Sequence, residues 1–501
     1  MRRFVSFIVG LLGRLVRGVP FGLLMFGAWA QQPVPYVQVS AGGFKSLALR
    51  ADGTLWAWGS NVDGELGIGA PTAADVLVPQ QVALPVGLPP GSAWARVSAG
   101  SSHALAIASN GSLWAWGTNG YGELGLGTGN ASPSYATRPV AVGVPAGTRW
   151  VRCAASTVFS LGIQTDGTLW QWGRNPVSPS GTWYDTPRPV VAPGAAPGTT
   201  WTEVSSCRYH VLALRSDGTL WAWGLNRYGE LGDGSQTDRW VPVAVPVPAG
   251  APAGAHWVQA AAGREFSLGL LSTGALYGWG SNANGVAGPA AAPLQPAVLP
   301  MPAGAAPGTG WQQVQVGIAH AAALLSDGSL WTWGENVYGQ LVDNTQAVPG
   351  GPVREATHGT WAQVAGGHVH TLAIAADGSV FAGGAAAGPG GANRWNFGQL
   401  GNGTRDGSLV LRRTLAVALG TRPAARAAYR LYPNPAGAWL AVEGLPATAR
   451  LTLTTALGQP VLVQPASHLA RLNLDHVAAG TYLLRVEAEN VAPQTLRVLV
   501  E

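Results

Sequence analysis

The sequence predicts an all-β protein that consists of a seven-bladed β-propeller followed by a small Ig-like β-sandwich. Three observations lead to this fold: seven related strings, short stretches in which large and small residues alternate, and a composition rich in turn formers. The 501 residues include 71 Gly, 37 Pro and 22 Trp, and only 11% are charged. Such a chain is too apolar for disorder and too rich in Gly and Pro for long helices. A closed array of repeats suits its length.

Each repeat contains a two-residue turn between two strands. Successive turns are 58, 56, 51, 56, 54 and 50 residues apart, at Asp52-Gly53, Asn110-Gly111, Asp166-Gly167, Asp217-Gly218, Thr273-Gly274, Asp327-Gly328 and Asp377-Gly378. Asp-Gly and Asn-Gly favour the positive φ angles of a tight hairpin. A W-x-x-V-x-A-G strand, with Tyr36 for Trp in the first copy, precedes the hairpin, and an edge strand with proline follows it. Four strands per copy make one propeller blade.

The tryptophans follow the repeat, since 17 of the 22 lie at the W-x-x-V and W-x-W positions. A residue type that recurs in every blade is expected to fill the space between neighbouring sheets, because a large aromatic side chain buries much surface. An aromatic platform for sugars or bases is the alternative. The structural set of the W-x-W strands comprises Trp56, Trp58, Trp114, Trp116, Trp170, Trp172, Trp221, Trp223, Trp279, Trp331 and Trp333.

The combination of A-G-x-x-H-x-L-A-L, D-G-x-L-W-x-W-G and N-x-x-G-E/Q-L-G resembles the repeat of the regulator of chromosome condensation family. The resemblance covers roughly residues 36–418 and implies a seven-bladed β-propeller. Copies five and seven depart from it: Trp279 is followed by Asn284-Gly-Val-Ala-Gly288, and Phe381-Ala-Gly-Gly384 lacks tryptophan. We expect these blades to pack more loosely or to be shaped by a contact.

The N-terminus predicts export. Residues 1–30 combine a basic start, apolar stretches and Ala28-Trp29-Ala30, which favours a signal peptide cut before Gln31; a retained membrane anchor is the alternative. Its removal takes away four arginines, and the formal charge falls from +5 to +1. The basic composition is therefore weak support for a nucleic-acid partner, and we expect none. No other segment reads as transmembrane.

The propeller is expected over residues 31–420 and a second module over residues 421–501. Strand-like runs at 451–453, 461–463, 472–474, 482–486 and 496–500 favour a small β-sandwich. Its Tyr432-Pro433-Asn434-Pro435 start and the later Leu474-x-x-Val477-x-x-Gly480-x-Tyr482 resemble the type A C-terminal sorting domain of type IX secretion in Bacteroidetes. The resemblance implies contact with the type IX secretion machinery and a secreted or surface-attached protein. An Ig-like adhesive module is the alternative.

The repeated polar residues are the candidates for a catalytic or metal-binding role. Four copies have histidine at one position, His103, His210, His320 and His370, where the others have Lys45, Phe159 and Phe266. Replacement by Phe favours packing over a metal site, and the His368-x-His370 pair lacks a third ligand nearby. The acidic residue of GELG, Glu65, Glu123 or Glu230, becomes Gln340 or Gln399 elsewhere, which favours a hydrogen-bonding role over catalysis. Cys153 and Cys207 are two buried thiols or one bridge.

These observations favour a non-catalytic, monomeric interaction scaffold without cofactor or metal, whose loops bind an unknown protein or surface glycan. Aromatic residues outside the fixed positions are the candidate interaction residues: Trp183, Tyr184, Tyr135, Tyr228 and Trp240. A secreted bacterial branch of the same repeat family resembles β-lactamase-inhibitory proteins, which makes inhibition of a secreted or periplasmic enzyme the first alternative. Guanine-nucleotide exchange, the activity of the nuclear members, and a lyase or glycosidase acting on polysaccharides are the further ones.

Overall fold

The computed structural model describes residues 34–415 and 430–500, apart from 70–73, 128–134, 145–146, 175–181, 290–291, 358, 389–394, 433–437, 456–458 and 489–490. The expected signal peptide and most of the Tyr432-Pro433-Asn434-Pro435 start lie outside the described residues. The chain divides into two compact units, Met1–Leu415 and Ala416–Glu501. Each is considered by itself below.

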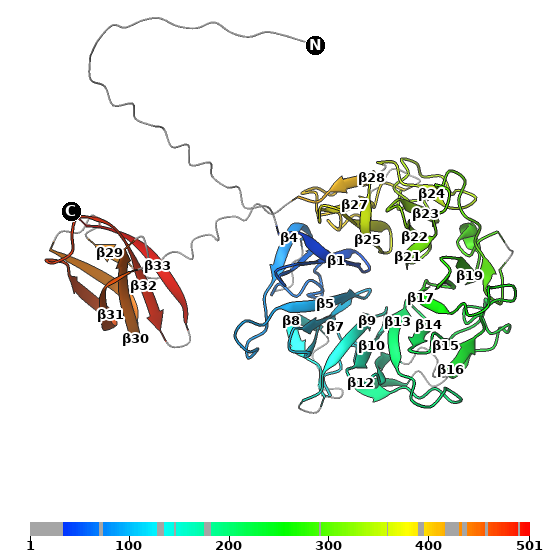
Figure 1. Ribbon diagram of the computed structural model, residues 1–501, viewed down its shortest axis with the longest axis horizontal. Coiled ribbons are helices and arrows are strands. Elements are labelled where there is room, and N and C mark those ends of the chain that lie inside the picture. Colours follow the sequence, from blue (N-terminus) through cyan, green and yellow to red (C-terminus); the bar gives the residue numbers. More distant parts are fainter. Residues whose placement is uncertain are drawn as a thin grey trace, which may run out of the picture. The chain divides into compact units, whose positions relative to one another are not determined.

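Seven antiparallel sheets of four strands form the first unit, and each sheet comes from one continuous stretch of the sequence (Figure 1). The prediction of seven blades is confirmed. From the innermost to the outermost strand, blades 1 to 4 are β1 Tyr36–Ala41, β2 Lys45–Arg50, β3 Leu55–Gly59 and β4 Val76–Val82; β5 Trp94–Ala99, β6 His103–Ala108, β7 Leu113–Thr118 and β8 Tyr135–Ala141; β9 Trp150–Ala155, β10 Phe159–Gln164, β11 Leu169–Arg174 and β12 Trp183–Pro189; β13 Trp201–Ser206, β14 His210–Arg215, β15 Leu220–Gly224 and β16 Arg239–Val245.

Blades 5 to 7 have the same order, although two of their outer strands are short. Their strands are β17 Trp257–Ala262, β18 Phe266–Leu271, β19 Leu276–Gly280 and β20 Ala297–Val298; β21 Trp311–Val316, β22 His320–Leu325, β23 Leu330–Gly334 and β24 Val353–Arg354; β25 Trp361–Gly366, β26 His370–Ala375, β27 Val380–Gly384 and β28 Ser408–Arg413. Within the described ranges the single helical element is the 3-10 turn η2 Ala283–Gly285, and no helix there is long and apolar enough to cross a membrane.

In six of the seven blades, the side chain of the Asp or Asn that begins the hairpin turn accepts a hydrogen bond within the turn. In blade 4, Asp217 Oδ1 accepts hydrogen bonds from the backbone N–H and the hydroxyl of Thr219 at 3.0 and 2.6 Å. Gly218 has φ of +78°, a conformation that costs glycine little. The Thr219 hydroxyl in turn accepts from Trp221 Nε1 at 2.9 Å, so the turn also orients the first tryptophan of the W-x-W strand.

The ring closes without an exchanged strand. The outermost strand β28 pairs with β27 of its own repeat, so each repeat is one whole blade. Blade 7 meets blade 1 through backbone bonds from Tyr36 N to Gly378 O at 2.9 Å and from His368 N to Gly42 O at 3.3 Å. Similar bonds around the axis, such as Ser101 N to Ser156 O at 3.1 Å, join other neighbouring blades. Closure therefore uses the same contacts as the other junctions.

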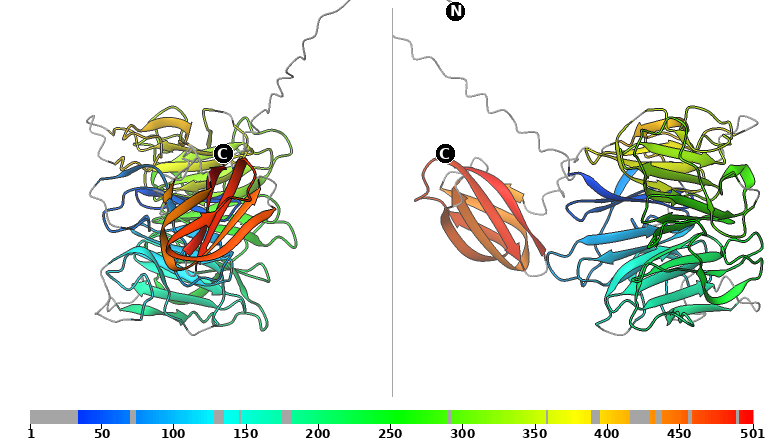
Figure 2. Two further views of the ribbon diagram at one scale, coloured as in Figure 1. Left: turned by 90° about the vertical axis from the view of Figure 1, so that its left-hand side faces the viewer. Right: turned by 45° about the vertical axis from the view of Figure 1, so that its right-hand side comes forward.

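The second unit is one sheet of five strands, which are β29 Arg430–Tyr432, β30 Trp439–Thr455, β31 Pro460–Asn473, β32 Gly480–Ala488 and β33 Val491–Val500 (Figure 2). The sequence predicts separate strands at 461–463 and 472–474, but residues 461–463 and 472–473 belong to the single strand β31. The two halves of β30 contribute Leu440 and Leu453 to one buried cluster. The long strands thus bring both halves of the sheet onto the same core, which gives the sandwich.

Candidate functional site

Four of the seven blade junctions are joined by a buried chain of hydrogen bonds that begins at histidine. His103 Nε2 lies 2.9 Å from Ser160 Oγ of the next blade, and this hydroxyl donates to the carbonyl oxygen of Glu123 at 2.8 Å. Because the hydroxyl proton is committed to the carbonyl, Nε2 must be the donor to Oγ. The same arrangement joins His210, Ser267 and Glu230; His320, Thr371 and Gln340; and His370, Ser46 and Gln399.

These histidines are neutral structural groups. Burial lowers the pKa of His103, His210 and His370 to about 3, and that of His320 to about 4. Each side chain has an exposed fraction of 0%, and its Nε2 already has a hydrogen-bond partner. Among the residues that the structure describes, no group of three or more His, Cys, Asp or Glu could hold a metal ion.

The other three junctions replace the histidine together with its partner. Phe159 packs in one buried cluster with Val211 of the next blade, and Phe266 with Ala321. Blades 3 and 5, which carry these phenylalanines, also lack the Glu or Gln of the GELG turn. At the junction of blades 1 and 2, Lys45 Nζ donates to the carbonyl oxygens of Gly100 and Ser101 at 2.8 and 2.9 Å. Burial lowers the pKa of Lys45 to about 8.

The GELG carboxylates hold their own turns. An Oε2 of Glu123 accepts from the backbone N–H of Tyr121 at 2.8 Å, and Gln340 Oε1 accepts from Tyr338 N at 2.9 Å in the same way. Only an acceptor is required, which explains why Gln replaces Glu. Burial raises the pKa of Glu123 and of Glu230 to about 7, so both carboxyls titrate near neutral pH while they bridge the turn.

The second tryptophan of the W-x-W strand seals the same junction. Trp172 Nε1 donates to the carbonyl oxygen of Glu123 in the preceding blade at 2.8 Å, and its exposed fraction is 0%. Gly125 has φ of +66° and lies so close that an added Cβ would be 2.8 Å from Trp172 Nε1. Equivalent bonds are made by Trp58, Trp116, Trp279 and Trp333.

Blades 5 and 7 lack part of the repeated motif, but other residues keep their junctions closely packed. Blade 5 provides the carbonyl oxygen of Val286, which accepts from Trp333 Nε1 at 2.9 Å. Blade 7 has Gly383 where the second tryptophan would stand, and Val342 of blade 6 lies against it. Val342 takes the place of the turn glycine, is fully buried and retains a positive φ of 52°. The volume lost from one blade is thus supplied by its neighbour.

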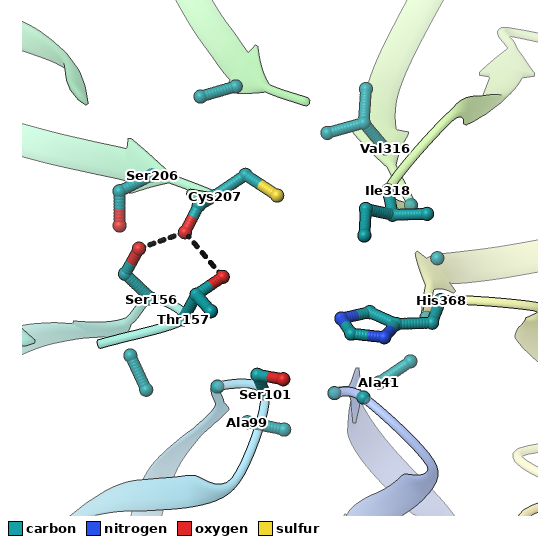
Figure 3. A pocket seen from close by; sticks show the side chains of 18 residues that line it. Ala41, Ala99, Ser101, Ser156, Thr157, Ser206, Cys207, Val316, Ile318 and His368 are labelled. Atoms are coloured by element: carbon teal, nitrogen blue, oxygen red, sulfur yellow. Dashed lines mark hydrogen bonds between the residues drawn. The ribbon is translucent and has the colours of Figure 1, made fainter. Parts of the chain in front are cut away.

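The turns between the first and second strands of the seven blades surround a pocket of about 80 Å³ on the axis (Figure 3). His368 and Cys207 point into it, while Ser156 Oγ and Thr157 Oγ1 donate to the carbonyl oxygen of Cys207. Burial, followed by the positive charges of Lys45, Arg208 and Arg264, lowers the pKa of His368 to about 4. Burial raises the pKa of the Cys207 thiol to about 12.

This pocket offers no activated nucleophile at neutral pH, because the thiol is protonated and the imidazole is neutral. His368 and His370 do not act as a pair: His368 packs edge-on against Phe44 at 5.5 Å between ring centres, and His370 binds Ser46. Cys153 and Cys207 are free thiols. Burial also raises the pKa of Cys153 to about 12.

The predicted interaction residues lie on the outer strands and turns. Trp240, Tyr135, Trp183 and Tyr228 have exposed fractions of 50, 40, 37 and 37%. The structure brings Tyr184 and Trp240 together, whereas the other three lie outside that group. Tyr184 and Trp240 line one groove of about 290 Å³ between the outer strands β12 and β16, with Gln171, Arg188 and Trp223 among its other residues.

The hydroxyl partners of the histidines and the role of Gln171 are absent from the predictions made from the sequence. Trp223 Nε1 donates to Gln171 Oε1 at 3.2 Å, because blade 3 has no GELG carbonyl to accept this bond. A signal for the hydroxyls is present in the sequence: His at one blade coincides with Ser or Thr one position further on in the next blade, and Phe coincides with Val or Ala. Comparing successive copies, rather than aligning all seven at once, reveals it.

Comparisons with known proteins agree with this architecture. The RCC1-like domain matches residues 22–304, and regulator of chromosome condensation (RCC1) repeats match residues 311–340 and 327–374. The secretion system C-terminal sorting domain matches residues 430–501, which implies secretion or export to the cell surface. Similar solved structures include human WBSCR16, with a TM-score of 0.62 and 24% identity, where the match covers 68% of this chain and 88% of that one. Prp20p from Saccharomyces cerevisiae is also similar, with a TM-score of 0.61 and 19% identity, and the match covers 79% of this chain and 90% of that one.

Curated relatives include the ultraviolet-B receptor UVR8 of Arabidopsis thaliana, which is 31% identical over 60% of this chain, and the E3 ubiquitin-protein ligase HERC2 of Homo sapiens, which is 29% identical over 62%. The match spans 66% of the plant receptor and 6% of the human ligase. The family match extends over more than half of the sequence, and the seven blades agree with it. The chain therefore belongs to the family of proteins with an RCC1-like domain.

Proposed function

We propose that the protein is a non-catalytic interaction scaffold that acts outside the cell or at its surface. One contrast carries the proposal: the repeated histidines and carboxyl groups are buried and hydrogen-bonded between or within blades, whereas four of the five variable aromatic residues are exposed on the rim and the fifth, Tyr184, is half-buried there. A rigid ring with variable outer segments is a common basis for recognition. The candidate contact residues are Trp183, Tyr184, Tyr135, Tyr228 and Trp240.

Binding by the mature chain, residues 31–501, tests this function. The immobilised protein should retain a macromolecule from the secreted or surface fraction of the producing cells. A variant in which the five candidate aromatic residues are alanine should retain less of it at an unchanged melting temperature. Equal retention by the variant would contradict the assignment of the rim. Turnover of a polysaccharide or another substrate by the parent protein would contradict the non-catalytic role.

We further propose that the C-terminal module delivers the propeller through the type IX pathway. The sorting-domain match supports this route. A chain that ends at residue 420 should then accumulate in the periplasm, while the full chain reaches the surface or the medium. As a control, residues 421–501 fused to an unrelated folded protein should export it. Equal export of the truncated and full chains would overturn the proposal.

A further inference from the structure

The groove between blades 3 and 4 lies beside a repeat whose sequence departs from the others. In blade 2, the turn 119–125 covers the tryptophan of the following blade: Leu124 is fully buried, and Trp172 binds the carbonyl oxygen of Glu123. Blade 3 has Arg-Asn-Pro-Val-Ser-Pro at the equivalent point of its sequence and no Gly-Glu-Leu-Gly. The corresponding tryptophan, Trp223, is buried and lines a groove of about 290 Å³. That volume is near the lower end of ordinary small-ligand sites.

The walls of this groove combine aromatic faces with a few polar groups. Trp240 has an exposed fraction of 50%, and Tyr184 lines the groove from the facing strand β12. The guanidinium carbon of Arg188 lies 4.3 Å from the centre of the Tyr184 ring. Gln171 Oε1 is held by Trp223 Nε1 at 3.2 Å, which leaves the amide N–H groups of Gln171 as donors. Arg188 is the single ionisable cation among the described residues of the lining, and no carboxylate is among them.

We propose that this groove binds a short stretch of an acidic polysaccharide. The apolar C–H face of a pyranose ring fits a flat indole or phenol ring, which is apolar on its face and polar at one end. Gln171 supplies donors to sugar hydroxyls, and Arg188 can take a sugar carboxylate in a charge-assisted, two-pronged bond. The proposal rests on the proposed function, because it gives the chemistry of one partner of the scaffold.

An extended peptide fits this place less well. A peptide that adds to an outer strand needs backbone N–H groups along the edge. Pro187 and Pro189 in β12 and Pro242 in β16 lack that donor. A groove of this volume also takes one or two sugar rings, whereas a specific protein interface needs a far larger area. The observations therefore favour the polysaccharide.

Titration of the mature chain with a uronate tetrasaccharide and with a neutral tetrasaccharide of glucose tests the proposal. The uronate should bind, and the neutral sugar should bind about 10-fold more weakly, since it has no carboxylate for Arg188. Trp240→Ala and Tyr184→Ala should each weaken uronate binding by about 10-fold or more. Arg188→Gln should remove the preference for the uronate. Tyr121→Ala, which removes an exposed aromatic side chain of blade 2 that lies outside the groove, is the control and should bind normally.

The outcomes separate this inference from the proposed function. If the parent captures a protein but no tetrasaccharide, the polysaccharide site is wrong and the scaffold stands. If the parent captures neither, the proposed function fails as well. Binding of a proline-rich peptide that Trp240→Ala abolishes, without sugar binding, would assign the groove to peptides and overturn the inference. Equal binding of both sugars by the parent would overturn the role of Arg188. Thermal melting of each variant shows whether a loss of binding reflects unfolding.

Discussion

The junctions between blades 2 and 3 and between blades 3 and 4 use the same tryptophan in two settings. Trp172 binds the carbonyl oxygen of Glu123 beneath a complete turn, and next to it His103 binds Ser160. Trp223 instead binds the side chain of Gln171, and the histidine and serine are replaced by Phe159 and Val211. Equivalent positions in the ring are thus filled by a hydrogen-bonded pair at one junction and by an apolar pair at the next.

This difference indicates that the residues on the two sides of a junction must match each other, whereas a single repeat does not need to keep one fixed residue. A buried hydroxyl or imidazole without a partner costs free energy, so both must be present or both absent. The same logic accounts for Val342 beside Gly383, where a larger residue in one blade fills the space left in the next. The four predictions below test this comparison, in order of decreasing effect.

Removing the junction tryptophan should have the largest effect. Trp172→Ala should lower the free energy of unfolding by about 3–5 kcal/mol, through lost burial and a cavity. Trp223→Ala should cost about 1 kcal/mol less, because its space borders an open groove that water can enter. Urea unfolding of the two variants measures both values. Equal losses would show that the groove does not change how much this side chain contributes to stability.

Removing the hydroxyl should have a moderate effect that a second change repairs. Ser160→Ala should cost about 1–3 kcal/mol, because His103 Nε2 and the Glu123 carbonyl each lose a buried partner. The double variant His103→Phe with Ser160→Val copies the pair of the next junction and should recover most of this loss. A double variant that is less stable than Ser160→Ala alone would show that the apolar pair cannot replace the polar pair at this junction.

The sequence supports the blade count and strand order because each turn is determined locally, as Asp217, Gly218 and Thr219 are within three residues. It does not reveal the hydroxyl partners in the same way, because Ser160 lies 57 residues from His103. The merging of two expected strands into β31 is equally nonlocal, since it depends on pairing along the whole of β30. The groove was hidden for a similar reason: Tyr184 and Trp240 come together only through the packing of two blades.

The carboxyl of the complete turn should make stability depend on pH. The pKa of Glu123 is raised above its ordinary range to about 7, so the folded state holds the proton more tightly than the unfolded state does. The resulting stabilisation is full below about pH 4.5 and is lost as the pH rises through about 7. Glu123→Gln keeps the acceptor, as Gln340 does, without the charge. Its stability relative to the parent should therefore rise between pH 5 and pH 9, by on the order of 1–2 kcal/mol.

The reciprocal change sharpens this test. Gln340→Glu places a titrating carboxyl in the equivalent turn of blade 6, beside Glu335, whose Oε2 accepts from Gln340 Nε2 at 3.3 Å in the parent. The stability of this variant relative to the parent should fall over the same range of pH. Urea unfolding at several pH values gives both differences. A relative stability that is flat with pH in both variants would show that these turns exclude water less than their burial implies.

The smallest effect is expected at the rim, where the candidate interaction residues lie. Trp183 opens the outer strand β12 with an exposed fraction of 37%, whereas Trp172 in the same blade is fully buried. Trp183→Ala should change the free energy of unfolding by less than about 0.5 kcal/mol, since surface substitutions that break no buried contact have little effect. Thermal melting beside Trp172→Ala measures the difference. A loss as large as that of Trp223→Ala would place Trp183 in the packing of the ring and remove it from the candidates for recognition.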